Sequence, residues 1–342
     1  MCRFRMTDLA LCVAVHASMI LCGQMGVGEP RREHFQTADV TYGWAQDSAG
    51  HKLRIFVTRP RNTAAKVPAL FFVGWLSCDS VEYPDGETDS FGAILRRLID
   101  QSGYATMRMD KPGVGESEGD CSKTDYQTEL SGYQAAFDQL LKYDFIDPTR
   151  IVVIGLSNGG GTGPLAPGPH PVRGYVAASS WGRTWYEHML ELERVRLTAA
   201  GKSPTEVNAA MKVFPFFYNS YLTEGQTPGQ VLAGHPDWKA LWYDAPDGQY
   251  GRPAAFYQQL QALNLGQLWG QVSVPVLVIH GSADQIMSTA DSRAIADSVN
   301  HAHPGNATQV EIEGADHGLA TRNKLDDRVV PTILDWLQGV VK

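Results

Sequence analysis

The chain has 342 residues, a net charge of −8 and 43% apolar residues. This length and apolar content suit one large α/β domain that carries an insertion. The negative charge and the lack of a basic cluster argue against nucleic acid as a partner, and beyond the N-terminal segment no stretch is apolar for long enough to span a membrane.

The first 28 residues have the pattern of a signal peptide. Arg3 and Arg5 provide a positive start, an apolar stretch runs from Leu9 to Cys22, and small residues follow it. We therefore predict residues 1–28 to be a signal peptide and the protein to be secreted or periplasmic. An upstream extension from a misplaced start codon is the alternative, and Cys22 leaves a lipoprotein as a lesser option.

Beyond residue 30, strand and helix patterns alternate along the chain. Two β-rich stretches at 39–44 and 52–58, separated by a turn, predict an antiparallel pair. Apolar runs predict further strands, and stretches with a helical period predict helices between them. The strands are expected at 69–73, 104–109, 151–154, 174–178, 274–280 and 309–312, and the helices at 91–101, 126–143, 290–299 and 326–341.

Between residues 181 and 271 the periodicity changes to helical stretches with many aromatic residues and no convincing buried strand. Because the strand–helix alternation resumes afterwards, the sequence predicts a mostly parallel sheet that is interrupted by an insertion. Loops at the carboxyl edge of such a sheet build sites, so the insertion is expected to lie over that edge. We predict a core of residues 29–180 and 272–342 and a helical cap of residues 181–271.

The most informative motif is the apolar run 151–154 followed by Gly155-Leu156-Ser157-Asn158-Gly159. The run predicts a buried strand, and the glycines permit a sharp, strained turn into a helix that exposes the Ser157 hydroxyl. Free N–H groups at the start of the helix would stabilise a developing negative charge. The pattern is typical of the nucleophile elbow of α/β-hydrolases. An ordinary glycine-rich turn is the alternative.

A nucleophilic serine needs a base, and the base needs an orienting acid. Asp284 lies just beyond a buried strand, and His317 lies in a glycine-flanked loop after the last strand. Asp316 is a rival acid, but a residue adjacent to the histidine in sequence is expected to point elsewhere. Asp284 could instead cap the next helix, although Ser288 or Asp291 would serve better there.

Two other histidines have simpler interpretations. His280 is expected to pack at the end of a strand. His188 stands beside Glu187 and Glu191 in the insertion and is expected to be solvated. Neither is predicted to act as the base.

Gly113 and Gly115 follow a strand and could indicate a dinucleotide-binding loop. Position 118 is glutamate where the third glycine should stand, and no helix follows directly. The sequence also contains neither a P-loop motif nor a His-Glu-x-x-His zinc motif. We therefore expect no cofactor and no metal.

From about residue 39 to its end, the chain resembles the α/β-hydrolase superfamily. Besides the elbow, Asp110 to Ser117 match the Asp-x-x-Gly-x-Gly-x-Ser loop that follows the fourth strand in that family. Asp284 and His317 follow the serine in the family's order. The resemblance implies a mostly parallel central sheet flanked by helices, with a helical cap inserted after the sixth strand. It does not imply a substrate, because one fold hosts many chemistries.

The resemblance also implies roles for individual residues. Ser157 would be the nucleophile, His317 the base and Asp284 the acid that orients it. Two backbone N–H groups would form the oxyanion hole, one of them from Asn158.

The second N–H group of the oxyanion hole would come from the loop after the third strand. Trp75 is the expected donor, and Leu76 is the alternative because Val73 replaces the histidine that is usual in the family. In the cap, Trp181 and Trp185 are expected to bind substrate.

These features predict a serine hydrolase that cleaves small-molecule carboxylic esters through an acyl-serine intermediate. A serine peptidase or amidase is the alternative, and Glu187, Glu191 or Glu193 could then bind the substrate's amine. A binding protein with a relic site is a third option, against which the complete triad argues. The sequence does not indicate the natural substrate or the oligomeric state.

Five cysteines are present, and the first three would leave with a signal peptide cleaved after Cys22. In the family's fold, Cys78 and Cys121 follow neighbouring strands, so we predict a disulfide between them. It would close a loop of 43 residues and suit an exported protein. Two free thiols in a cytosolic enzyme are the alternative.

Overall fold

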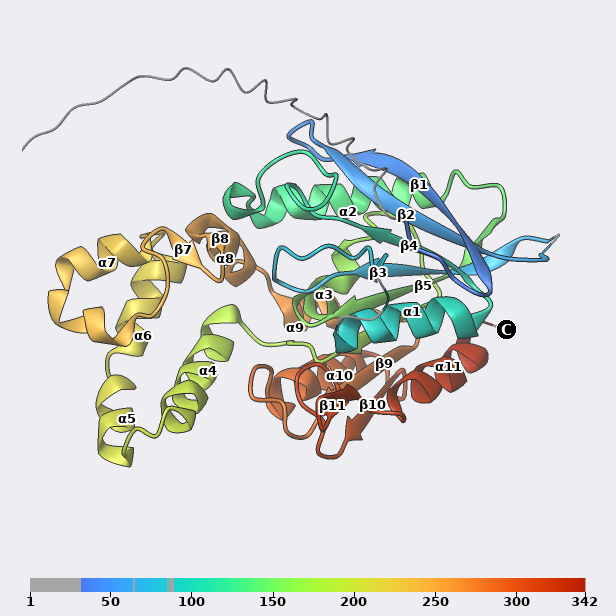
Figure 1. Cartoon of the computed structure of the whole chain (residues 1–342). Helices are drawn as coiled ribbons and strands as arrows, with labels where there is room; N and C mark the ends of the chain where they lie inside the picture. Colours follow the sequence, from blue (N-terminus) through green and yellow to red (C-terminus); the bar gives the residue numbers. More distant parts are fainter. Residues whose placement is uncertain (1–31, 64, 85, 87–88, 342) are drawn as a thin grey trace, which may run out of the picture. The chain divides into compact units, whose positions relative to one another are not determined.

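A computed structural model describes residues 32–63, 65–84, 86 and 89–341. An eight-stranded sheet forms its centre, with the strand order β1-β2-β4-β3-β5-β6-β9-β10 (Figure 1). The first two pairs in this order, β1–β2 and β2–β4, are antiparallel, and all the others are parallel. The strands of this sheet are β1 (Ala38–Gln46), β2 (Lys52–Pro60), β3 (Val67–Val73), β4 (Ala105–Met109), β5 (Ile146–Leu156), β6 (Gly174–Ala178), β9 (Val276–Gly281) and β10 (Ala307–Ile312).

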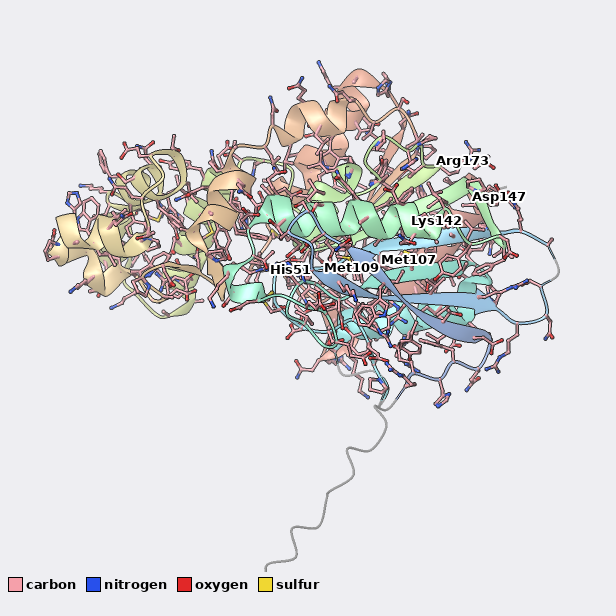
Figure 2. All side chains as sticks on the ribbon, turned by 90° about the horizontal axis from the view of Figure 1, so that it is seen from above. His51, Met107, Met109, Lys142, Asp147 and Arg173 are labelled. Atoms are coloured by element: carbon pink, nitrogen blue, oxygen red, sulfur yellow. A yellow bond between two sulfur atoms is a disulfide. The ribbon has the colours of Figure 1, made fainter. Side chains whose placement is uncertain are left out.

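Helices cover both faces of the sheet because successive side chains of the central strands point to opposite sides. Leu70 and Phe72 of β3 join one cluster with α1 (Ser90–Ser102) and α11 (Val329–Val340). Phe71 joins the other cluster with α2 (Tyr126–Leu140) and α10 (Thr289–Ala302). Figure 2 looks onto α2, beside which Met107 and Met109 of β4 are buried. The predicted α/β architecture, a mostly parallel sheet flanked by helices, is confirmed.

The segment between β6 and β9 is mainly helical. Side chains cap three of its helices reciprocally, as in Thr184 with Glu187 at the start of α4. An aromatic cluster that includes Phe217, Tyr218 and Trp242 packs inside it. The elements of this segment are α4 (Trp185–Ala199), α5 (Pro204–Ala210), α6 (Phe214–Tyr218), α7 (Pro228–Gly234), β7 (Gly248–Gln249), β8 (Arg252–Pro253), α8 (Ala254–Gln261) and α9 (Leu265–Gly270). We call residues 181–271 the insertion.

Most expected elements lie where the sequence placed them, and the differences are at their ends. The helix expected to end at residue 143 ends at Leu140, and the helix expected from residue 326 begins at Val329. Asp326 instead accepts hydrogen bonds from the backbone and side chain of Arg328, which shape the turn before that helix. The helix expected after Ser157 is α3 (Asn158–Thr162), whereas the sequence did not reveal the short pairs β7–β8 and β11 (Ala320–Thr321) with β12 (Lys324–Leu325).

The predicted signal peptide, residues 1–28, lies outside the described residues. Within the described part of the chain, no helix combines the length and the apolarity that crossing a membrane requires.

Candidate active site

Ser157 occupies a strained turn between β5 and α3. Its backbone has φ 54° and ψ −121°, in the left-handed half of φ space that non-glycine residues adopt only at a cost. A Cβ atom at Gly155 would lie 2.3 Å from the carbonyl oxygen of Gly159, and one at Gly159 would lie 2.4 Å from that of Gly74. Only glycine therefore fits on either side of the serine, as the motif predicted.

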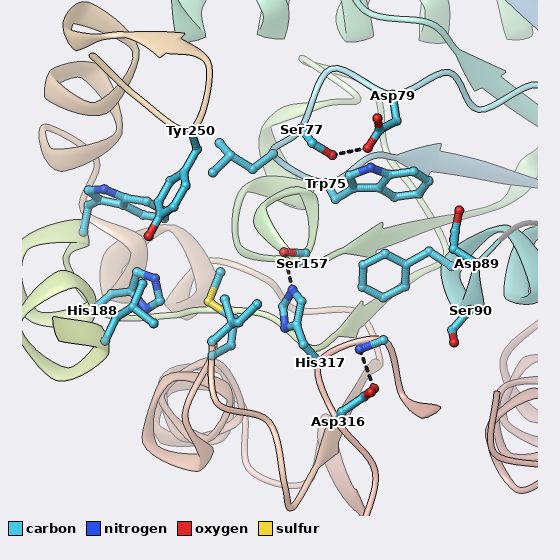
Figure 3. Close-up of a pocket in the computed structure, with 17 residues that line it drawn as sticks. Trp75, Ser77, Asp79, Asp89, Ser90, Ser157, His188, Tyr250, Asp316 and His317 are labelled. Atoms are coloured by element: carbon cyan, nitrogen blue, oxygen red, sulfur yellow. Dashed lines mark hydrogen bonds between the residues drawn. The ribbon is translucent and has the colours of Figure 1, made fainter. Parts of the chain in front are cut away.

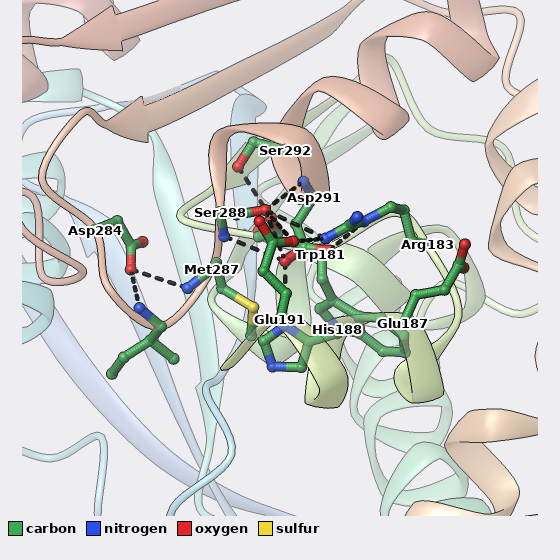
Figure 4. Close-up of polar contacts among 12 residues, drawn as sticks. Trp181, Arg183, Glu187, His188, Glu191, Asp284, Met287, Ser288, Asp291 and Ser292 are labelled. Atoms are coloured by element: carbon green, nitrogen blue, oxygen red, sulfur yellow. Dashed lines mark hydrogen bonds and ion pairs between the residues drawn. The ribbon is translucent and has the colours of Figure 1, made fainter. Parts of the chain in front are cut away.

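Ser157, His317 and Asp284 are joined by hydrogen bonds. The Oγ of Ser157 lies 2.9 Å from Nε2 of His317 (Figure 3), and Nδ1 of His317 lies 2.9 Å from Oδ2 of Asp284. The Asp284 side chain is fully buried. Its other oxygen accepts the backbone N–H groups of Ile286 and Met287 at 2.8 and 2.9 Å (Figure 4). The carboxylate is thus held in place, so it can orient the imidazole with Nε2 toward the serine.

Two alternatives remained for the aspartates: Asp316 as the acid, and Asp284 as a helix cap. The contacts of these residues decide both. Asp316 accepts the N–H groups of Gly318 and Ala320 and thereby shapes its own loop. Ser288 is the N-cap of α10, so the alternative helix-capping role for Asp284 is wrong.

The loop after β3 presents N–H groups beside the serine. Among the described residues, no hydrogen bond uses the backbone N–H of Trp75, Leu76 or Asn158. Trp75 and Leu76 line the same cavity as Ser157. Unpaired N–H groups near a nucleophile can stabilise an oxyanion, and both predicted donors of this loop remain available.

Buried side chains hold the peptide groups of this loop. Nζ of Lys111 donates to the carbonyls of Trp75 and Ser77, the latter at 2.8 Å. The hydroxyl of Tyr133 accepts the N–H of Gly74 at 3.0 Å. These contacts restrict rotation of the peptide planes that carry the free N–H groups.

Arg252 of β8 reaches the same loop from the insertion. Its Nε donates to the carbonyl of Leu76 at 3.2 Å, and its Nη1 donates to that of Cys121 at 3.0 Å. It also forms a buried ion pair with Glu129 of α2. Burial lowers the pKa of Arg252 to about 10, which leaves the guanidinium charged at neutral pH. The insertion is thereby tied to the loop beside the nucleophile.

The structure contains the predicted disulfide between Cys78 and Cys121, whose Cα atoms are 6.1 Å apart. It connects the loop after β3 with the loop after β4, two strands that are neighbours in the sheet. The bond therefore gives the loop that carries Trp75 a second covalent attachment.

Reduction of this disulfide is expected to lower the free energy of unfolding by roughly 4 kcal/mol, because the loop it closes spans 43 residues. Urea unfolding with and without reductant measures the change. A Cys78→Ala/Cys121→Ala double variant is the control, since reductant should not affect it. An unchanged wild-type midpoint on reduction, with complete thiol alkylation, would contradict the prediction.

The loop at Asp110 is structural, as expected. The buried Asp110 carboxylate accepts the Ser80 hydroxyl and the Val81 N–H, and burial raises its pKa to about 6. A Cβ atom at Gly115 would lie 2.3 Å from this carboxylate. The Ser117 hydroxyl donates to the Asp110 carbonyl at 2.9 Å. The glycines thus serve the packing of this loop.

A cavity of about 580 Å³ lies over Ser157 and His317 (Figure 3). The core contributes Trp75 and Phe91 to its wall, and the insertion contributes Trp185 and Tyr250. A few aromatic residues of the insertion therefore line the cavity, while most of the others pack within the insertion.

Trp181 does not form the surface of this cavity. It is completely buried, and its indole packs edge-on against Trp185 with ring centroids 4.9 Å apart. A Cβ atom at Gly161 would lie 2.6 Å from its Nε1, so Trp181 packs directly on the helix that follows the nucleophile. Of the two predicted substrate-binding tryptophans, only Trp185 lines the cavity.

The expectation that His188 is solvated is wrong. Its side chain is 2% exposed and lines the cavity. Trp185, His188 and Leu192 all line the cavity from α4, and their spacing of three and four residues marks one helix face. This spacing in the sequence could have predicted that His188 lies on the same helix face as Trp185. His280 is buried against Ser292, as predicted.

The three glutamates proposed to bind an amine are engaged elsewhere. Glu187 caps α4, Glu191 pairs with Arg183, and Glu193 accepts the hydroxyl of Tyr218. Within the described residues, no cluster of three or more His, Cys, Asp or Glu side chains could hold a metal ion.

Comparison with known proteins defines the class of this chain. Residues 88–322 match the family model described as serine aminopeptidase, S33, and the chain belongs to this α/β-hydrolase family. No curated protein sequence matches the chain.

Several solved structures share the fold. Est1E from Butyrivibrio proteoclasticus, solved with ferulic acid, is 20% identical, with a TM-score of 0.56 over 87% of this chain and 96% of that one. An esterase domain from Rhodothermus marinus is 17% identical, with a TM-score of 0.54 over 89% and 100%. A thermophilic esterase from Thermogutta terrifontis, bound to malate, is 18% identical, with a TM-score of 0.51 over 88% and 100%. At these identities the likeness establishes the fold alone.

Proposed function

We propose that this α/β-hydrolase cleaves carboxylic esters of small molecules through an acyl-serine intermediate. The observation that carries the proposal is the hydrogen-bonded series of Ser157, His317 and Asp284 beneath an apolar cavity. The similar structures named above include esterases, which supports the same type of reaction.

In the first half of the reaction, His317 takes the proton of Ser157 as Oγ attacks the ester carbonyl. Asp284 holds the imidazole with Nδ1–H toward itself and stabilises the imidazolium that forms. The carbonyl oxygen becomes negative and is bound by the N–H of Asn158 together with that of Trp75 or Leu76. His317 then gives its proton to the leaving alcohol.

In the second half, water attacks the acyl-serine with His317 again as the base, and the carboxylic acid leaves. A burst of p-nitrophenol from a p-nitrophenyl ester, equal in amount to the enzyme, tests for this intermediate. Failure to turn over any ester in a panel of varied chain length would contradict the proposal.

A serine aminopeptidase is the second candidate, because the matching family model carries that description. Matched ester and aminoacyl-amide substrates with the same acyl group distinguish the two functions. Faster cleavage of the amide would favour the peptidase.

We further propose that the insertion acts as a cap that selects substrates, since it supplies Trp185, His188 and Tyr250 to the cavity wall. The domain boundaries at residues 181 and 271 belong to this proposal. Secretion or export to the periplasm is also proposed, and the disulfide supports it because such bonds persist in oxidising compartments.

Replacing Arg252 with methionine is expected to lower kcat about tenfold with little change in KM. The variant loses the hydrogen bond to the Leu76 carbonyl, so the loop that carries the oxyanion-hole donors is held less firmly. These donors act mainly in the transition state, and kcat is therefore affected more than KM. Steady-state kinetics on one p-nitrophenyl ester measures the effect.

Because Arg252→Met leaves the buried Glu129 with only the more distant Lys111, at 3.9 Å among the described residues, an Arg252→Met/Glu129→Gln variant provides a folded comparison. Arg194→Met, on the exposed side of α4, is the matched control. Wild-type kcat in a folded Arg252→Met variant would show that the oxyanion loop does not need this contact.

A further inference from the structure

His188 contributes a ring nitrogen to the side of the cavity formed by the insertion. Figure 3 shows His188 and Tyr250 on one side of Ser157, and Trp75 with Asp89 on the other. The rest of the wall on the His188 side is largely apolar and includes Trp185, Leu192 and Met287. A substrate bound over Ser157 therefore meets a polar group within an otherwise apolar surface.

The orientation of the ring is set by Asp291 of α10. Nδ1 of His188 lies 3.1 Å from Oδ2 of Asp291 (Figure 4), and the side chains are only 2% and 1% exposed. Nε of Arg183 donates to the other carboxylate oxygen at 2.8 Å. Three elements of the fold therefore hold this pair in place: the segment before α4, α4 itself and α10.

Asp291 is ionised in this arrangement. Burial by itself would raise the pKa of Asp291, but the hydrogen bonds and charges of His188 and Arg183 outweigh it, so the pKa lies below its usual range. A carboxylate only accepts hydrogen bonds, so Nδ1 of His188 is the nitrogen that donates to Asp291. In the neutral form of the ring, Nε2 is then a hydrogen-bond acceptor.

No hydrogen bond among the described residues uses Nε2 of His188, although the side chain is almost completely buried. The atom is not one of the fully enclosed polar atoms without a partner, so it is open to the cavity. A ligand that supplies a donor there gains a hydrogen bond within a largely apolar wall. Tyr250, the other polar residue on this side, has its hydroxyl 2.6 Å from that of Tyr243 and is already engaged.

We propose that His188, oriented by Asp291, accepts a hydrogen bond from a hydroxyl group of the substrate. The substrates would then be esters with an apolar, ring-sized body and a hydroxyl group remote from the scissile bond. This inference rests on the proposed esterase function. His188 is a recognition residue in it and takes no part in proton transfer to or from Ser157.

Matched esters with and without the hydroxyl test the proposal. In one pair the hydroxyl is in the acyl group, as in methyl 3-(4-hydroxyphenyl)propanoate and methyl 3-phenylpropanoate. In the other it is in the alcohol, as in 2-(4-hydroxyphenyl)ethyl acetate and 2-phenylethyl acetate. In the wild type, kcat/KM for the hydroxylated ester is expected to exceed that of its partner about tenfold or more in one of the pairs.

His188→Phe should reduce this preference to about one, because the ring shape is kept and the acceptor is lost. His188→Gln, whose amide oxygen can accept, should recover part of the preference. Leu192→Met, one turn along α4 on the same wall, is the matched control. It should change both esters of a pair alike and keep their ratio.

The inference would be overturned by the absence of a hydroxyl preference in either pair, or by a wild-type preference that persists in a folded His188→Phe. An equal loss of several orders of magnitude on both esters would also overturn it, because it would show a catalytic role. Calorimetric binding of the same esters to Ser157→Ala separates this inference from the proposed function. If no ester is cleaved, a hydroxyl-dependent affinity that His188→Phe removes still supports the recognition site, and its absence counts against it.

Discussion

Replacing Ser157 with alanine is expected to lower kcat on esters by about 10³-fold or more. The hydroxyl is the group that attacks, and the remaining binding and oxyanion contacts cannot form the acyl intermediate. The fold should survive, because the side chain makes only the hydrogen bond to His317 among the described residues. Initial rates and a thermal unfolding curve for both proteins measure the two effects.

Covalent labelling gives an independent test of the same residue. An organophosphonate probe should modify Ser157 alone, as read by mass spectrometry of the digested protein. Ser90→Ala is the matched control, because Ser90 also lines the cavity and should be neither labelled nor needed. Labelling at another serine, or activity that survives in Ser157→Ala, would sink the assignment of the nucleophile.

Replacing Asp284 with asparagine is expected to lower kcat by several orders of magnitude. The same substitution in the acid of a Ser-His-Asp triad lowers kcat by about 10⁴-fold. Asp284 accepts three hydrogen bonds, one from His317 and two from backbone N–H groups. The backbone pair selects the amide oxygen of asparagine, so its NH₂ faces His317. The imidazole then carries its proton on Nε2 and can no longer accept from Ser157.

Asp316→Asn is the matched comparison because Asp316 is adjacent to the base and lines the same cavity. Among the described residues its carboxylate accepts only the N–H groups of Gly318 and Ala320, and an amide oxygen can accept these equally well. We expect a loss of less than about tenfold. The pH dependence of kcat/KM for both variants should show whether the base is affected. Reversed effects of the two substitutions would mean that the acid is misassigned.

The nucleophile and its surroundings could be predicted because their signals are local. The run of buried residues before Gly155 and the two glycines around Ser157 specify a strand, a strained turn and a helix start within eleven residues of chain. Asp284 follows the buried, apolar strand β9, and His317 follows the edge strand β10. Parallel strands bring their carboxyl ends to one edge, so knowing the strands was enough to bring these three residues together.

The disulfide was predictable for a related reason. Once residues 1–28 are set aside, only Cys78 and Cys121 remain, and each follows one of two strands that are neighbours in the sheet. The resemblance to the α/β-hydrolases implied this strand order, so the pairing could be predicted without side-chain detail.

Contacts between the insertion and the core were beyond the reach of the sequence. His188 was expected to be solvated because acidic residues flank it, yet its partner Asp291 lies 103 positions away on α10. No sequence motif pointed to Arg252, and its partners Leu76 and Glu129 lie 176 and 123 positions away. Periodicity shows which face of a helix is apolar, but not which element will cover that face.

The sequence by itself therefore determined the α/β fold, the nucleophile and the order of its partners, because each depends on a short pattern or on strand order. Only the tertiary structure decided which side chains support the oxyanion loop and which polar group faces the substrate. Those contacts depend on how the insertion packs on the core. Many weak contacts between segments distant in sequence determine that packing, so no short stretch of sequence predicts it.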